Sequence, residues 1–326
     1  MTLYFIICLF GFVFLYFGAD WLVKGSSSLA RALGITPLVI GLTVVAFGTS
    51  APELVVSLVS AIKGKSMIAV GNVVGSNICN IALVLGLAAL FQPITSHRSV
   101  VRRDIPLMLG ISIYLLILSC NSCIGRIEGA TLFAGIILYT LFNYYAAMKG
   151  TGAEAHVKKE DIASELQDIG YIESGKKQIA LILVGIIGVI AGAQAVVESS
   201  VKIMTLLGVS EKFIGLTIVA FGTSLPELAT SVIAALRKEM DISIGNLVGS
   251  NVFNIMSVLG AAALVRPIFI SGGFFASFLY VDYLVMMFTS LLPWMMMRKD
   301  LTIRRRDGGI LLACYAGYIA YLIIKA

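Results

Sequence analysis

The chain contains two nearly identical stretches, and this duplication constrains the fold more than any other feature. Residues 34–93 align with residues 208–267 without a gap, at a constant offset of 174 positions, and 32 of the 60 aligned residues are identical. Chance similarity of composition does not produce identity at this level. The two stretches are therefore expected to fold into equivalent units, and a solenoid is disfavoured because it needs more copies.

Both copies lie in strongly apolar sequence. Hydrophobic residues make up 59% of the 326 residues and charged residues 13%, whereas a soluble domain has about 25% charged residues. Successive apolar runs of roughly 20 residues have the length that spans a bilayer as a helix. The sequence predicts an integral membrane protein whose partner is the lipid bilayer, and the net charge of +6 reflects basic loops rather than a nucleic-acid partner.

The pattern predicts an all-α membrane protein with ten transmembrane helices. The apolar N-terminal segment has no basic region or cleavage site before it and is expected to be a retained first helix. The domains expected are an N-terminal five-helix repeat over 1–148, a linker loop over 149–177 and a C-terminal five-helix repeat over 178–326. The predicted spans are 3–23, 36–62, 68–92, 104–120, 126–148, 178–206, 212–236, 242–266, 274–297 and 307–325.

The basic residues predict an orientation in the membrane. With the N-terminus outside, 17 of the 24 Lys and Arg residues fall in loops on the inner side, as the positive-inside rule requires. Both termini are then extracytoplasmic and the 149–177 loop is cytoplasmic, in a multi-pass protein of the plasma membrane. Five helices separate equivalent points of the two copies, so the second copy enters the membrane from the opposite side. Secondary transporters are built from such inverted repeats, with their ion sites near the midplane.

The first repeated motif places an acid inside a membrane helix. It reads "VAFGTSAPELVVS" at 45–57 and "VAFGTSLPELATS" at 219–231. Thr49 and Ser50 precede Glu53 by four and three residues, so the three side chains share one helix face; Thr223, Ser224 and Glu227 repeat the arrangement. A carboxylate at this depth costs at least ~2.5–3 kcal/mol. The repeated helices carry no basic residue near their centres, so a proton or a metal cation must neutralise it.

A proline beside each acid interrupts the helix. Pro52 and Pro226 free the carbonyls four residues back, at Gly48 and Gly222, which membrane depth tolerates only where protein or a water-lined cavity satisfies them. Carboxylate, hydroxyl and carbonyl oxygens together suit Ca²⁺ or Na⁺ rather than Zn²⁺ or Cu⁺. The alternative is a kinked helix with a protonated glutamate bonded to a neighbouring helix, which the matched pair of copies disfavours.

The second repeated motif is a polar stripe, "GNVVGSNICNIALVLG" at 71–86 and "GNLVGSNVFNIMSVLG" at 245–260. Its residues recur at i, i+4 and i+8, so they share one helix face. The stripe can bond neighbouring helices, complete the ion site, or do both. The ligands expected from it are Ser76, Ser250, Asn80 and Asn254, and the residues expected to be structural are Asn72, Asn77, Asn246 and Asn251.

Other polar residues carry weaker signals. Asp20 with Lys24, and Glu198 with Lys202, have the spacing of interfacial ion pairs, and a gate or proton path is the alternative.

Cys120 and Cys123 form "CNSC" without a second pair to complete a zinc site. Residues 158–169 read as a surface helix. A hydrolase is excluded because the only histidines, His97 and His156, lie in polar loops.

Together, "GLTVVAFGTSAPEL" with "GLTIVAFGTSLPEL", and "GNVVGSN" with "GNLVGSN", resemble the α-repeats of the sodium/calcium exchanger family. The resemblance implies ten helices in two inverted halves. It also implies that the second, third, seventh and eighth helices form the core and that the first and sixth slide across it. It favours a compact prokaryotic-type exchanger that needs no cofactor and is not an enzyme. A monomer is compatible with it.

The resemblance also implies a set of ion ligands. Glu53 and Glu227 bind Ca²⁺, helped by the backbone carbonyls of Thr49 and Thr223. The flanking Na⁺ sites and the central position involve Ser50, Ser76 and the Ala46 carbonyl on one side, Ser224, Ser250 and the Ala220 carbonyl on the other, and Asn80 with Asn254 in the centre. Several family members carry an aspartate in one central position, where this chain has asparagine. The number of Na⁺ ions and the coupling therefore stay open.

These residues predict an antiporter that exchanges Na⁺ for Ca²⁺ by alternating access. Two carboxylates carry a charge of −2, which one Ca²⁺ neutralises, and several Na⁺ leave the site neutral or slightly positive. The exchange is thus expected to be electrogenic and to move Ca²⁺ outward. The alternatives are a proton- or K⁺-dependent antiporter on the same fold and a passive cation channel.

Overall fold

The computed structural model describes residues 1–150, 172–209 and 220–325, and all of its long elements are helices. Most of the 149–177 loop, the 158–169 segment, His156 and the start of the 212–236 span lie outside the described residues. The helices of the first half are α1 (Thr2–Ala32), α2 (Pro37–Ile40), η1 (Gly41–Val45), α3 (Ala46–Thr49), α4 (Ala51–Ile62), α5 (Ser66–Ile78), η2 (Cys79–Leu85), α6 (Gly86–Phe91), η3 (Val100–Asp104), α7 (Ile105–Ser119) and α8 (Arg126–Gly150).

The second half repeats this order. Its helices are α10 (Gly175–Leu206), α12 (Ala220–Gly222), α13 (Leu225–Leu236), α14 (Met240–Phe253), η5 (Asn254–Leu259), α15 (Gly260–Val265), α16 (Leu279–Met297) and α17 (Arg305–Lys325). The offset of 174 seen in the sequence relates α4 to α13 and α6 to α15 at both of their ends. The repeated sequence therefore folds into repeated structure wherever both copies are described.

Seven described helices are long and apolar enough to cross a bilayer, and the bent pair Pro37–Thr49 and Ala51–Ile62 makes an eighth span. The chain is accordingly an all-helical membrane protein. Two further apolar helices, α7 and α13, are shorter, with 15 and 12 residues. The predicted count of ten spans in two inverted halves stays a prediction.

The predicted break beside each proline is present. The helix turns by 46° between α3 and α4, where Ser50 leaves helical geometry and Pro52 occupies the first turn of α4. Ser224 and Pro226 have the equivalent places before and within α13. Proline fits the first turn of a helix because its missing N–H is not needed there.

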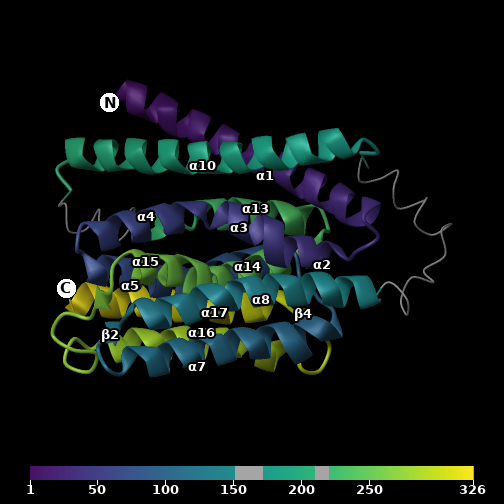
Figure 1. Cartoon of the computed structure of the whole chain (residues 1–326). Helices are drawn as coiled ribbons and strands as arrows, with labels where there is room; N and C mark the ends of the chain where they lie inside the picture. The colour runs from purple at the N-terminus through teal and green to yellow at the C-terminus, as the bar shows by residue number, and fades with distance from the viewer. Residues whose placement is uncertain (151–171, 210–219, 326) are drawn as a thin grey trace.

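The helices form stacked layers, with α1 and α10 lying side by side along one face of the bundle (Figure 1). Small residues let these two backbones approach closely. A Cβ on Gly18 would come within 2.7 Å of the Val189 nitrogen, and one on Gly185 within 2.6 Å of the Leu22 nitrogen. Such small-residue contacts are typical of packing between membrane helices.

Three features differ from the prediction. The helix expected over 274–297 begins only at Leu279, because Gly272, Gly273 and Phe278 have positive φ angles and hold the preceding residues in turns. Short two-residue strand pairs, which were not predicted, join β1 (Ile94–Thr95) to β4 (Thr302–Ile303) and β2 (Cys123–Ile124) to β3 (Ile268–Phe269). The π-helical segments η1, η2, η3 and η5 were not predicted either.

Candidate functional site

Glu53 and Glu227 lie in the first turns of α4 and α13, and both side chains are completely buried. Ser50, three residues before Glu53, donates a hydrogen bond to Glu227, so the two acids lie in the same part of the core. Among the described residues, no Lys, Arg or His forms an ion pair with either carboxylate. A buried charge without a partner is costly, so this pair requires protons or bound cations.

Hydroxyl groups from other helices reach each carboxylate. Ser50 donates to Glu227 Oε1 at 3.1 Å, and Ser76 donates to Glu53 Oε1 at 3.4 Å. The Ser50 contact crosses from one repeat to the other, and the Ser76 contact joins two helices of the first repeat. Each acid is thus held at one oxygen only.

Thr49 links the two motifs. Its hydroxyl lies 3.4 Å from the Ala46 carbonyl oxygen, 3.0 Å from Asn246 Oδ1 and 3.4 Å from the Ser250 hydroxyl. These contacts bring the predicted ligands Ala46, Thr49 and Ser250 together at the packing of α3 against α14.

The central asparagines are held by reciprocal hydrogen bonds across the repeats. Asn80 Nδ2 donates to Asn251 Oδ1 at 3.2 Å, and Asn254 Nδ2 donates to Asn77 Oδ1 at 3.1 Å. Asn77 and Asn251 also donate to each other's backbone carbonyl, at 3.2 and 3.3 Å. Their structural role was predicted, but their part in orienting Asn80 and Asn254 was not, because spacing along one helix does not show which side chains meet across two.

These contacts leave a set of buried oxygens without a hydrogen-bond partner in the described part of the chain. Burying such groups without partners is costly. Six of the fourteen such atoms in the described residues belong to predicted ligands. They are Glu53 Oε2, Glu227 Oε2, Asn80 Oδ1, Asn254 Oδ1, Thr223 Oγ1 and Ser224 Oγ. Carboxylate, amide and hydroxyl oxygens are the donor set that hard cations prefer.

Ala220 begins α12, directly after the undescribed residues 210–219. No hydrogen bond of its carbonyl is therefore part of the geometry above. Its role as a ligand stays a prediction. The described residues contain no group of three or more His, Cys, Asp and Glu side chains that could hold a metal ion, so the candidate site depends on two acids and neutral oxygens.

The remaining asparagines of the polar stripe anchor the site helices. Asn72 Nδ2 donates to the Glu53 carbonyl at 3.2 Å and to the Ser57 hydroxyl at 3.0 Å. Asn246 Nδ2 donates to the Ser231 hydroxyl at 3.0 Å, the equivalent contact in the second repeat. Ser57 and Ser231 were missed as partners, although both are identical between the copies.

The predicted pair of Asp20 with Lys24 is confirmed, at 2.9 Å. Asp20 is buried and also forms an ion pair with Arg237, at the end of α13. The predicted pair of Glu198 with Lys202 is wrong, because Glu198 instead accepts a hydrogen bond from Gln194 at 2.8 Å. The five cysteines are free, and Cys120 is exposed.

Comparisons with known proteins identify the family of the chain. The family model for the sodium/calcium exchanger protein matches residues 3–149 and 177–324. The chain is 37% identical over 325 residues to the putative antiporter CaxA of Alkalimonas amylolytica, covering 98% of both chains. It is 33% identical over 351 residues to the sodium/calcium exchanger MaX1 of Methanosarcina acetivorans, covering 99% of both.

A solved structure of the sodium-calcium exchanger NCX_Mj, soaked with Na⁺ and Ca²⁺, superposes with a TM-score of 0.82 at 33% identity and covers 98% of both chains. The family resemblance drawn from the two motifs is therefore confirmed. The chain belongs to the sodium/calcium exchanger protein family and is a membrane transporter of the cation/Ca²⁺ antiporter type.

Proposed function

We propose that the chain exchanges Na⁺ for Ca²⁺ across the plasma membrane by alternating access, with Ca²⁺ moving outward. The observation that carries this proposal is the pair of fully buried carboxylates, Glu53 and Glu227, without a basic partner in the described residues. Their joint charge of −2 matches one Ca²⁺. The unpartnered amide and hydroxyl oxygens around them complete a hard-cation site.

Competition for the same oxygens couples the two ions. Ca²⁺ takes Glu53 and Glu227 with the carbonyls of Thr49 and Thr223. Na⁺ occupies positions formed by Ser50, Ser76, Ala46, Ser224, Ser250 and Ala220, and Asn80 with Asn254 forms the centre. The empty site carries two buried charges and is too costly to pass through the membrane barrier. Only the occupied forms change access, so the Na⁺ gradient drives Ca²⁺ uphill.

The architecture proposed with this function is two inverted five-helix halves, 1–148 and 178–326, joined by the cytoplasmic loop 149–177. Both termini are then extracytoplasmic. The repetition of α4 and α6 by α13 and α15, end for end, supports two equivalent halves. The distribution of basic residues supports the orientation.

The test is Ca²⁺ uptake into liposomes that contain the purified chain and carry an outward gradient of Na⁺, K⁺ or H⁺. Uptake is expected with the Na⁺ gradient. If net positive charge leaves the liposome during exchange, uptake should be faster at an inside-positive potential than at an inside-negative one. Uptake that ignores Na⁺ and follows K⁺ or H⁺ would assign the chain to one of the alternative antiporters. Uptake without any counter-ion would indicate a channel.

A further inference from the structure

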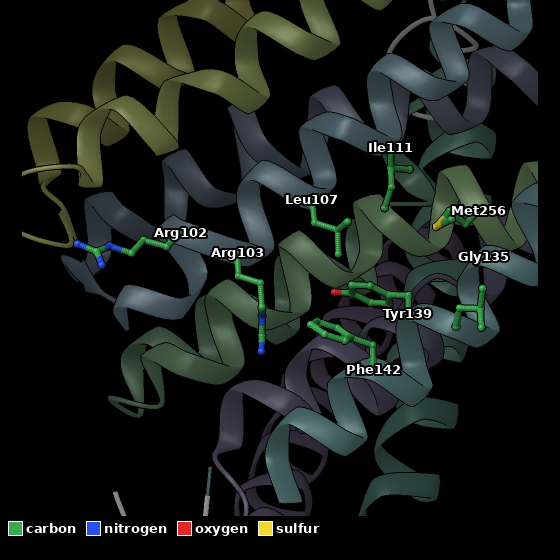
Figure 2. Close-up of a pocket in the computed structure, with 9 residues that line it drawn as sticks. Arg102, Arg103, Leu107, Ile111, Gly135, Tyr139, Phe142 and Met256 are labelled. Carbon is green, nitrogen blue, oxygen red and sulfur yellow. The ribbon is translucent and has the colours of Figure 1, made fainter. Parts of the chain in front are cut away.

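A groove between α7 and α8 lies away from the candidate ion site and has a volume of about 580 Å³. Figure 2 shows Arg103 at one end of the apolar side chains that line this groove, and Arg102 beyond it with its side chain directed away from them. Leu107 and Leu138 on its walls are 37% and 67% exposed. Because these residues belong to membrane helices, the groove opens toward the lipid.

A buried hydroxyl faces the interior of the groove. Tyr139 is only 5% exposed, and its hydroxyl has no hydrogen-bond partner among the residues that the structure describes. In Figure 2 this hydroxyl is on the side of the ring nearer to Arg103. A buried hydroxyl without a partner is costly, which points to a ligand that brings an oxygen acceptor into the groove.

The arginine end is positively charged. Arg103 is balanced by Asp104 at 2.7 Å, contacts Asn143 at 3.3 Å and lies 5.5 Å from the ring of Phe142. Arg102 is exposed, and no partner of its side chain is found in the described part of the chain. This end of the groove therefore has an uncompensated guanidinium.

A third guanidinium lies nearby on α16. Trp294 Nε1 donates to the carbonyl of Val101, next to Arg102, at 3.0 Å, and Arg298 stacks 4.7 Å above the Trp294 ring. The contact with α16 therefore holds the backbone beside Arg102, and Arg298 itself does not line the groove. An anion at the arginine end of the groove would meet a positive field.

We propose that the groove binds one anionic phospholipid of the membrane. An acyl chain lies along Leu107, Leu138 and Phe142. The phosphate lies near Arg103, and the exposed Arg102 side chain turns toward it on binding. The Tyr139 hydroxyl donates to an ester or phosphate oxygen. Basic pockets between membrane helices on the cytoplasmic side are suited to anionic headgroups, and that leaflet is negatively charged.

The inner wall of the groove belongs to the ion-site helix. Met256 lies in η5, two residues after Asn254. Gly135 makes room for it, since a Cβ on Gly135 would come within 2.1 Å of Met256 Cε. The lipid site and the candidate ion site therefore share one π-helical segment, although lipid binding does not depend on which ions are transported.

The experiment is native mass spectrometry of the purified full-length chain, equilibrated with equal amounts of phosphatidylglycerol and phosphatidylcholine that have the same acyl chains. One retained phosphatidylglycerol per chain is expected. Arg102→Gln should reduce its retention by about fivefold, the effect of one basic residue at a membrane surface. Tyr139→Phe, which removes only the hydroxyl, should reduce it by about fivefold as well.

Arg98→Gln is the matched control. Arg98 is an exposed arginine close to Arg102 that does not line the groove, so its replacement should leave retention unchanged. Equal retention of the two lipids by the wild-type chain would overturn the proposal. So would unchanged retention in both Arg102→Gln and Tyr139→Phe.

Discussion

Ser50 donates a hydrogen bond of 3.1 Å to Glu227, although the two residues are 177 positions apart in the chain. The contact joins the interrupted helix of the first repeat to the acid of the second. It places a hydroxyl predicted as a Na⁺ ligand directly on a carboxylate predicted as a Ca²⁺ ligand. The predicted Na⁺ ligands and the predicted Ca²⁺ ligands are therefore not independent of one another. Coupled exchange requires such a dependence.

Replacing one acid should abolish transport and stabilise the empty protein. Removing one partner of a buried charge interaction costs about 3–5 kcal/mol, so Glu53→Gln or Glu227→Gln should reduce Ca²⁺ uptake by roughly a hundredfold or more. Each change also removes one buried carboxyl group that has no basic partner among the described residues, so the melting temperature without ions should rise. Uptake assays and thermal unfolding in Na⁺-free, Ca²⁺-free buffer measure the two effects. Normal uptake with either variant would contradict the assignment.

Ser50→Ala should weaken the binding of Na⁺ and have a smaller effect on the stability of the protein. Loss of one hydroxyl contact to a charged group is worth about 1.5–3 kcal/mol, so the Na⁺ concentration for half-maximal uptake should rise by roughly tenfold or more. Ser57→Ala is the matched control, because Ser57 contacts Asn72 rather than an acid. It should lower the melting temperature without changing the Na⁺ dependence. A similar Na⁺ dependence in Ser50→Ala and wild type would remove Ser50 from the Na⁺ site.

Asn254→Asp should make stability depend on Na⁺. Asn254 Nδ2 donates to Asn77 Oδ1, and an ionised aspartate would set oxygen against oxygen there at a cost of about 1–3 kcal/mol. A bound Na⁺ or a proton would relieve this repulsion. The melting temperature of the variant should therefore fall below that of wild type in Na⁺-free buffer at high pH and recover on adding Na⁺. An equal Na⁺ effect on variant and wild type would show that this position does not sense the cation.

The ion pair between Asp20 and Arg237 should couple α1 to the end of α13. Asp20 is 5% exposed and pairs with both Arg237 and Lys24. In a double-mutant cycle on thermal unfolding, Asp20→Asn and Arg237→Gln should show a coupling of about 0.5–3 kcal/mol. Additive effects would mean that the two side chains act separately. If α1 slides during transport, as the family resemblance implies, both single variants should also change the uptake rate.

Local pattern was enough to predict the parts of the site that lie on one helix. The helix break at Pro52 and the place of Glu53 in the turn after it follow from the chemistry of proline. The single helix predicted to carry Thr49, Ser50 and Glu53 on one face was wrong, because the break lies between them and Ser50 contacts Glu227 instead. The duplication then transferred each of these inferences to the second copy. What helix spacing cannot provide is the face that meets another helix, so the reciprocal bonds between Asn77 and Asn251 were not predicted.

The same reason explains the other differences. The spacing of Asp20 and Lys24 predicted their ion pair, but not the burial of Asp20 where α1 packs against α13, nor its second partner, Arg237. The short strand pairs β1–β4 and β2–β3 form between segments that are far apart in the chain. The π-helical segments that begin at Cys79 and Asn254 have a rare geometry that occurs mostly inside α-helices, and helix spacing does not predict it.

The central claim is that Glu53 and Glu227 together form one Ca²⁺ site that Na⁺ competes for. Calorimetric titration of Ca²⁺ into the purified chain, in buffer where choline replaces Na⁺, tests it most directly. The account predicts one Ca²⁺ per chain, an apparent Kd that rises as Na⁺ is added, and no measurable binding in Glu53→Gln or Glu227→Gln. Stoichiometric Ca²⁺ binding that survives in either variant, or that is indifferent to Na⁺, would contradict it.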